Sequence, residues 1–193
     1  MVVALGSLAL VAIPANAGAD MSSPNLIENG NFARGILKRP WTEVHPGSRA
    51  IPGWRVIKNV DYVPAAYWEA PGGVASVDLD GSPGPGEIAQ TFATIPGHTY
   101  RVDFDLAANT DGPPRVKELR VSVAGTRRIF GFDRVGHSNR AMGYVQRGFE
   151  FTAIATATTL DFASLSRVGN WHGAVLGGVA VTETEPGTTG NRP

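Results

Sequence analysis

Polar and apolar residues alternate strictly in the stretch Thr99-Tyr100-Arg101-Val102-Asp103-Phe104-Asp105-Leu106. Successive side chains of a β-strand point to opposite faces of a sheet, so the aromatic and aliphatic residues share one face and the charged residues share the other. The stretch therefore predicts a strand with one face in a core and the other in solvent.

The same period of two recurs on both sides of this stretch. Alternating or apolar runs cover residues 74–79, 86–93, 119–123, 126–132, 149–151, 160–162 and 174–182. Turn residues bound each run, and no stretch carries a long apolar stripe at helical spacing. Short strands at regular intervals predict an all-β fold, either an antiparallel sandwich or a barrel.

The composition fits one globular domain and excludes several classes of protein. The 193 residues include 17 Lys and Arg, 17 Asp and Glu, 24 Gly, 14 Pro and no Cys. Without cysteine the chain cannot hold a disulfide framework, an iron–sulfur cluster or a thiolate zinc site. A net charge of zero argues against a nucleic-acid partner, because nucleic-acid binding surfaces are strongly basic.

The two ends of the chain are predicted to lie outside the domain. An apolar run at residues 2–13, followed by Ala15-Asn16-Ala17, predicts a signal peptide over 1–17 and a secreted, extracellular protein. The run is shorter than the roughly 20 residues of a membrane helix, and no other run approaches that length, so membrane insertion is not expected. Residues 18–24 are predicted to be a linker, and the polar residues 184–193 a disordered tail.

Seven short motifs follow one another along the chain. They are Asn25-Leu26-Ile27-Glu28-Asn29-Gly30-Asn31-Phe32, Ile51-Pro52-Gly53-Trp54, Val60-Asp61-Tyr62-Val63, Ser76-Val77-Asp78-Leu79, Gln90-Thr91-Phe92, Pro96-Gly97-His98-Thr99-Tyr100 and Phe104-Asp105-Leu106-Ala107-Ala108-Asn109. The succession resembles the bacterial choice-of-anchor C family and related plant cell-wall proteins with galactose-binding-like domains. The resemblance implies that residues 25–183 form an antiparallel jelly-roll β-sandwich that binds glycans or wall proteins and is not catalytic.

The sequence departs from related sandwich modules at a calcium site. Many of those modules place a carboxylate just after the N-terminal Asn-Gly-Phe segment and another at the entry to the last strand. Ala33 and Gly177-Gly178 stand at these places here. Calcium prefers carboxylate oxygens, so no metal and no other cofactor is expected.

The loops predict where a ligand binds. Connections in an antiparallel sandwich reverse the chain, so alternate loops gather at one end. The longer set is predicted to lie together and to carry the binding residues, because binding residues favour extended loops on a rigid scaffold. An aromatic face and planar polar groups suit a sugar ring. The candidate ligand-binding residues are Asn109, Asp111, His137, Arg140 and Trp171.

The aromatic and histidine residues leave alternatives open. Trp171 either stacks on a sugar or caps the core, whereas Trp54 is predicted to lie in the core. Loop parity places Tyr67 and Trp68 at the end opposite the candidate site, as packing residues or a second contact patch. His137 is either a ligand-binding residue or an ordinary surface histidine.

Basic residues concentrate in one part of the chain. Residues 115–147 hold eight basic and two acidic side chains. Arg134 and Arg140 are candidates for contacts with an acidic polysaccharide. Arg120 is instead expected to pair with Asp103 or Asp105 on a neighbouring strand.

No motif in the sequence predicts catalysis. The sequence contains neither a Gly-x-Ser-x-Gly elbow nor a His-Glu-x-x-His pair. Asp78 and Asp80 are not expected to converge on one glycosidic bond, because Asp80-Gly81 is expected to enter a turn. The leading hypothesis is a secreted, non-catalytic module for cell-wall or extracellular carbohydrate, with acidic polysaccharides among the candidate ligands. The alternative is a structural or protein-interaction role with a wall-protein partner.

Overall fold

The computed structural model describes residues 23–82, 84–167 and 169–184. These residues form eleven strands and no helix. The strands are β1 (Thr42–Val44), β2 (Arg55–Lys58), β3 (Val60–Pro64), β4 (Ala75–Asp78), β5 (Glu87–Ala93), β6 (Thr99–Ala108), β7 (Val116–Val123), β8 (Thr126–Asp133), β9 (Val145–Thr152), β10 (Ala157–Ser164) and β11 (Ala174–Glu183). Within the described ranges no helix could cross a membrane.

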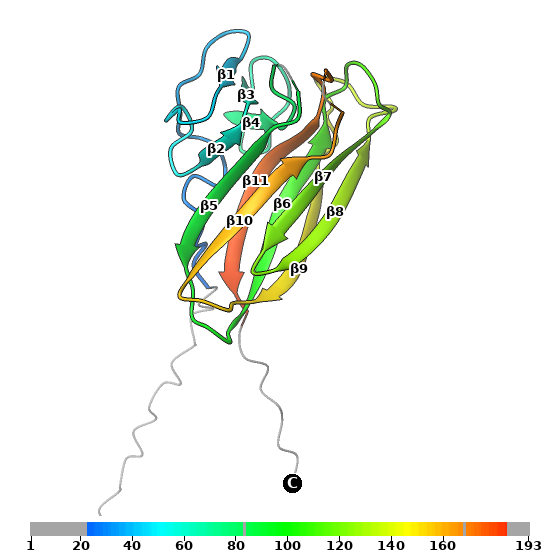
Figure 1. The fold of residues 1–193 in the computed structure, drawn as a ribbon. Helices are drawn as coiled ribbons and strands as arrows, with labels where there is room; N and C mark the ends of the chain where they lie inside the picture. The colour runs from blue at the N-terminus through cyan, green and yellow to red at the C-terminus, as the bar shows by residue number, and fades with distance from the viewer. Residues whose placement is uncertain (1–22, 83, 168, 185–193) are drawn as a thin grey trace, which may run out of the picture.

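Two antiparallel sheets pack face to face (Figure 1). The six-stranded sheet has the order β1-β3-β4-β11-β6-β9, and the five-stranded sheet has the order β2-β5-β10-β7-β8. The all-β antiparallel jelly-roll sandwich expected from the sequence is confirmed. The predicted signal peptide lies outside the described residues, as does the predicted tail beyond Thr184.

The alternating stretch becomes β6, and its apolar face builds the core. Tyr100, Val102, Phe104 and Leu106 are all at most 2% exposed. The ring of Phe104 meets that of Phe162 from the opposite sheet at 5.3 Å between centroids. Trp54, only 4% exposed, lies in the same core, as predicted.

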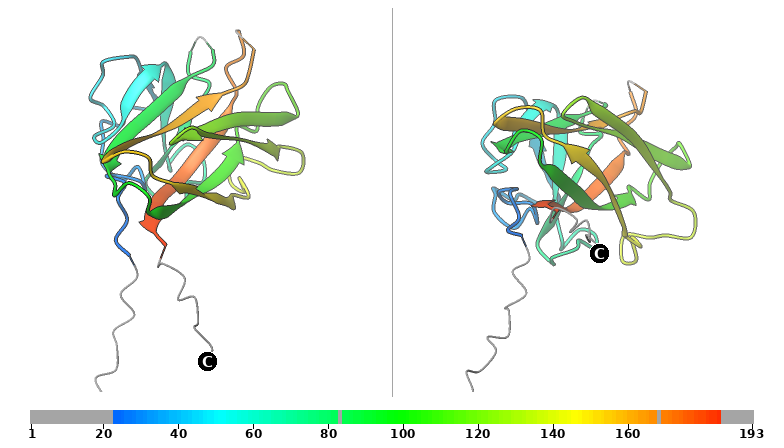
Figure 2. Two further views of the ribbon diagram at one scale, coloured as in Figure 1. Left: turned by 60° about the horizontal axis from the view of Figure 1, so that its bottom comes forward. Right: turned by 90° about the horizontal axis from the view of Figure 1, so that it is seen from below.

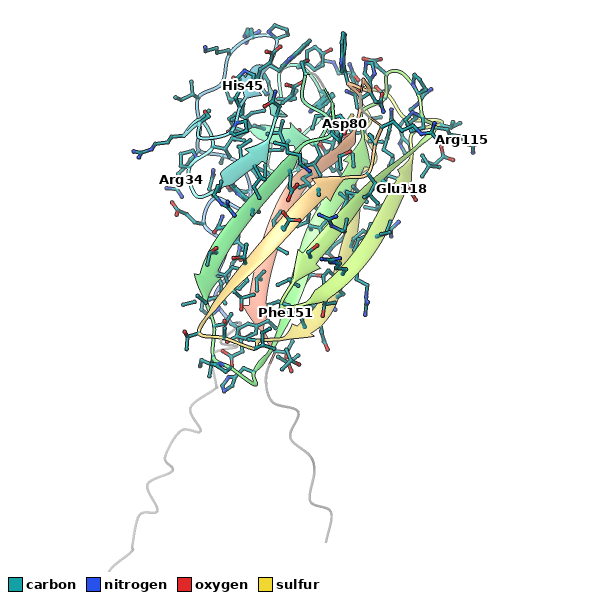
Figure 3. All side chains as sticks on the ribbon, viewed as in Figure 1. Arg34, His45, Asp80, Arg115, Glu118 and Phe151 are labelled. Carbon is teal, nitrogen blue, oxygen red and sulfur yellow. The ribbon has the colours of Figure 1, made fainter. Side chains whose placement is uncertain are left out.

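The long loops gather at one end of the sandwich, as the parity of the strands predicts. These are the β4–β5, β6–β7, β8–β9 and β10–β11 loops. Asp80 lies among them in Figure 3, whereas Phe151 lies at the opposite end. Both ends of the described chain emerge at this opposite end, as Figure 2 also shows. Residues 23 and 184, the two ends of the described chain, therefore lie away from the long-loop end.

Arg120 corrects one expectation about strand neighbours. β6 and β7 belong to different sheets, so Arg120 cannot pair with Asp103 or Asp105 as expected. Its Nη2 lies 3.5 Å from Oδ1 of Asp161 on β10, the adjacent strand of the same sheet. Arg120 therefore forms a cross-strand ion pair, as expected, but its partner is Asp161.

Candidate functional site

A small pocket of about 130 Å³ opens at the long-loop end. Three of the residues predicted from sequence line it: Asn109, Asp111 and Trp171. The rest of the lining comes from Trp41, Asp61, Val63, Tyr67, Trp68, Asp78, Ser82 and His172. The pocket thus joins loop residues to the outer face of the six-stranded sheet, from which Asp61, Val63 and Asp78 project.

Three aromatic rings form one wall of the pocket. Trp41 and Tyr67 meet edge to face, with centroids 5.5 Å apart and planes 74° apart. Tyr67 and Trp68 repeat this arrangement at 5.6 Å and 64°. The Trp68 indole donates to the hydroxyl of Ser76 at 2.7 Å, which fixes the ring over β4. The wall is therefore held before any ligand arrives.

The placement of Tyr67 and Trp68 corrects the sequence-based expectation. They lie on the β3–β4 loop, but β3 and β4 are short and sit beside the long-loop end (Figure 1). The loop folds back onto the outer face of the sheet, where Trp68 packs in one cluster with Val63 and Val175. The two aromatic residues therefore reach the candidate site instead of the far end.

Hydrogen bonds tie the surrounding loops to one another. The Glu69 amide donates to the Asn139 carbonyl at 2.7 Å, and the Met142 amide donates to the Glu69 carboxylate at 2.6 Å. The Thr110 hydroxyl donates to the side chain of Asn139 at 2.6 Å. These bonds link the β3–β4, β6–β7 and β8–β9 loops, so the surroundings of the pocket are preorganised.

Asp78 anchors the floor of the pocket. Its Oδ1 accepts hydrogen bonds from the amides of Asp80 at 2.9 Å and Gly173 at 3.0 Å. Its Oδ2 accepts from the Asn109 side chain at 2.7 Å. Burial nevertheless raises the pKa of Asp78 to about 8. Asp80 follows the end of β4, as expected, and its charge also acts to raise the pKa of Asp78.

Asp61 lies directly opposite Asp78 on β3. It is 7% exposed, and its Oδ1 has no hydrogen-bond partner. Burial and the nearby charge of Glu43 raise its pKa to about 7. Like charges on directly opposed residues destabilise a sheet, so the sequence places an energetically costly pair at the pocket floor.

Lys117 holds the loop that carries Asp111. This side chain is fully buried, and its Nζ donates to the carbonyls of Gly112 at 3.1 Å and Pro113 at 3.0 Å. It also contacts the Asp111 carbonyl at 3.4 Å. Burial lowers the pKa of Lys117 to about 8. Because the ammonium is committed to these carbonyls, Lys117 acts as a support for the pocket rim.

The other predicted residues do not join the pocket. His137 packs its ring against Phe132, at 4.9 Å between centroids, and Arg140 is exposed. Neither residue lines the pocket. Trp171 is 56% exposed, so it does not cap the core and its ring is accessible at the rim.

A second, more open groove lies on the outer face of the six-stranded sheet. It measures about 560 Å³ and runs between the N-terminal segment and strands β6, β9 and β11. Asp103, Asp105 and Gln146 contribute polar groups to it, and Phe104 is the one aromatic residue in its lining. Phe104 is directed into the core, so this groove presents no accessible ring face.

Comparison with solved structures finds the same fold in a carbohydrate-binding module and in part of an enzyme. A family 16 carbohydrate-binding module superposes with a TM-score of 0.51 at 17% sequence identity, covering 82% of this chain and all of that one. An arabinose-bound α-L-arabinofuranosidase superposes with a TM-score of 0.50 at 12% identity, covering 87% of this chain and 31% of the enzyme. The class of the fold is thus shared by separate modules and by parts of enzymes.

The chain belongs to the family described as proteins of unknown function DUF642, whose model matches residues 25–181. One relative is the Arabidopsis thaliana "Protein DUF642 L-galactono-1,4-lactone-responsive gene 1", which is 29% identical over 80% of this chain and 43% of that protein. Another is halomucin of Haloquadratum walsbyi, 28% identical over 83% of this chain and 2% of that protein. The chain spans less than half the length of either relative.

The buried carboxyl groups predict that stability falls as pH rises. Asp61 and Asp78 have folded-state pKa values of about 7 and about 8, above the unfolded-state value near 3.8. Their stabilisation is fully present below the unfolded-state pKa and is lost as pH rises through the folded-state values, because the unfolded chain then binds fewer protons. From about pH 5 to about pH 7 we expect the free energy of unfolding to fall by at least about 1 kcal/mol.

Urea denaturation across this range measures the effect, with Asp61→Asn as the matched variant. Two groups act in the opposite direction because burial lowers their pKa values: His172, whose ordinary value of 6.5 lies within this range, and Lys117, which titrates above it. The variant is expected to show a shallower pH dependence. A free energy of unfolding that rises with pH in the wild type would contradict the assignment.

Proposed function

We propose that this protein is a secreted, non-catalytic module that binds extracellular or cell-wall carbohydrate through the long-loop pocket. One observation carries the proposal: a preformed aromatic wall stands beside hydrogen-bonding carboxyl and amide groups. A sugar ring needs an apolar face to stack on and planar polar groups for its hydroxyls. Trp171 supplies an accessible ring, while Asn109 and Asp111 supply polar groups at the rim.

The shared fold supports this function without defining the ligand. The structural relatives include a carbohydrate-binding module and a part of a glycan-cleaving enzyme. Secretion stays a prediction from residues 1–17, and kinship with choice-of-anchor C proteins stays a prediction from the ordered motifs. A wall protein as partner is the second candidate, favoured by the exposed aromatic Trp171 and tested by the same binding experiment.

The charged residues in the pocket lining favour one kind of glycan over another. Its lining contains Asp61, Asp78 and Asp111 but no Lys or Arg. Arg140, once a candidate for acidic sugars, lies outside it. We therefore expect neutral polysaccharides to be retained better than uronic-acid polymers, by a margin that shrinks with added salt because salt screens the repulsion.

Affinity electrophoresis of residues 18–193 on a panel of neutral and acidic polysaccharides tests the function. Two variants separate the pocket from the open groove: Tyr67→Ala removes part of the aromatic wall, and Gln146→Ala alters the groove. Retention of the wild type should be lost in Tyr67→Ala and kept in Gln146→Ala. The reverse pattern would move the site to the sheet face, and no retention of the wild type on any polysaccharide would favour the protein-partner alternative.

A further inference from the structure

The pocket gathers more carboxyl groups than basic residues of its own lining balance. Asp61, with its unpaired Oδ1, and Asp78 face each other across β3 and β4 at the floor, and Asp111 lies at the rim. A buried carboxyl group without a partner is costly unless a ligand or a proton compensates it. The floor is thus built to accept hydrogen bonds or positive charge from a ligand.

The neighbouring cations of the protein are engaged elsewhere. Lys117 donates to backbone carbonyls of the β6–β7 loop, and Arg134 donates to the Thr110 carbonyl at 3.0 Å. His172 lines the pocket, but burial and the charge of Lys117 lower its pKa, which favours the neutral ring. The remaining charges close to the floor are Glu43 and His45, which act on Asp61, and Asp80, which acts on Asp78.

The aromatic wall favours a cation for an independent reason. Aromatic rings carry negative charge density on their faces and attract ammonium groups placed over them. Tyr67 meets both Trp41 and Trp68 edge to face, and the three rings line the same pocket as the carboxyl groups. Ring faces and carboxylates together form the kind of surroundings that hold an ammonium ion.

The size of the pocket limits what enters it. About 130 Å³ is the volume of about four water molecules, at about 30 Å³ each. An internal residue of a polysaccharide with both linkages does not fit such a space. One substituent or one edge of a terminal sugar does, while the rest of the ligand lies outside against Trp171.

We propose that the pocket binds a ligand through a positively charged ammonium group, and that its preferred glycan ends in a sugar with a free amine. The proposal rests on the carbohydrate-binding function proposed above. A small quaternary ammonium compound carries the same chemistry and is the other source of such a group. An N-acetylated sugar lacks the charge and serves as the matched neutral ligand.

Isothermal titration calorimetry of residues 18–193 at about pH 6.5 compares three probes. They are a glucosamine trimer, the N-acetylglucosamine trimer of the same length, and choline. We expect the glucosamine trimer to bind at least tenfold more tightly than its acetylated counterpart. Asp61→Asn should reduce this preference to less than threefold.

A proton measurement gives a second readout at the same site. An ammonium group beside a protonated carboxyl group lowers its pKa, so binding should release protons and the observed heat should depend on the ionisation enthalpy of the buffer. Asp111→Asn at the rim tests the charge contribution if Asp61→Asn does not fold, and a twofold to fivefold loss of the preference is expected. A preference that neither folded variant changes overturns the proposal.

The outcomes separate this proposal from the broader function. Equal affinity for the two trimers, or binding of neutral polysaccharides alone, overturns the ammonium proposal and leaves carbohydrate binding standing. Binding of choline without any glycan supports the ammonium site and overturns carbohydrate binding. No binding of any probe or polysaccharide overturns both.

Discussion

Replacing Trp171 by alanine is expected to weaken glycan binding at least tenfold while leaving the fold intact. The ring is 56% exposed and stands at the rim of the pocket, where it offers the most accessible aromatic surface of the site. Loss of a stacking ring that contributes about 1.4 kcal/mol or more to binding gives a tenfold loss of affinity. Titration calorimetry with the best ligand from the polysaccharide panel measures the effect.

Ile154→Ala is the matched control for this variant. Ile154 is also a large exposed apolar residue, at 75% exposure, and it lies in the β9–β10 loop at the opposite end of the sandwich. Its substitution should change neither affinity nor the free energy of unfolding. Equal affinities for Trp171→Ala, Ile154→Ala and the wild type would remove Trp171 from the site.

Asp78→Ala is expected to lower the free energy of unfolding by about 3 kcal/mol or more. The Asp78 carboxyl group accepts hydrogen bonds from the amides of Asp80 and Gly173 and from the side chain of Asn109. Alanine leaves these three buried donors without an acceptor, at about 1–3 kcal/mol for each, partly offset because a costly buried acid is removed. Urea denaturation at neutral pH measures the loss.

Asp78→Asn separates the lost hydrogen bonds from the lost acid. The asparagine oxygen still accepts from both backbone amides, whereas its NH₂ group faces the Asn109 donor, so a loss of about 1 kcal/mol is expected. The alanine variant should therefore be clearly the less stable of the two. If the free energy of unfolding of Asp78→Ala is within about 1 kcal/mol of the wild-type value, Asp78 does not anchor the pocket floor.

The strands and the long-loop end are readable from sequence because they follow from local periodicity. Alternation over residues 99–106 fixes which side chains of β6 face the core, and reversal at each turn fixes which loops share an end. Asn109, Asp111 and Trp171 reach the pocket for this reason. His137 and Arg140 belong to the correct end, but the long β8–β9 loop keeps them out of the pocket lining.

The aromatic wall depends on tertiary folding that the sequence pattern does not encode. Tyr67 and Trp68 reach the site because the β3–β4 loop folds back over the outer face of the sheet and bonds to the β8–β9 loop. Trp41 directly precedes β1 and meets Tyr67 there. The position of Asp61 opposite Asp78 depends on the register between β3 and β4, which the pattern of residues in either strand does not give. The one sequence signal that pointed to these residues was the adjacent pair of aromatic side chains at positions 67 and 68.

The four tryptophans provide the most direct test of the proposed carbohydrate site. Trp41, Trp68 and Trp171 line the pocket, whereas Trp54 lies in the core with its indole bonded to the Asn29 carbonyl. A ¹⁵N–¹H correlation spectrum resolves an indole N–H signal for each and can be recorded during titration with the retained glycan. We expect the Trp171 signal and at least one of the Trp41 and Trp68 signals to shift together with saturation, while the Trp54 signal stays in place. Saturable glycan binding that leaves the three pocket tryptophans unshifted would contradict the assignment of this pocket as the carbohydrate site.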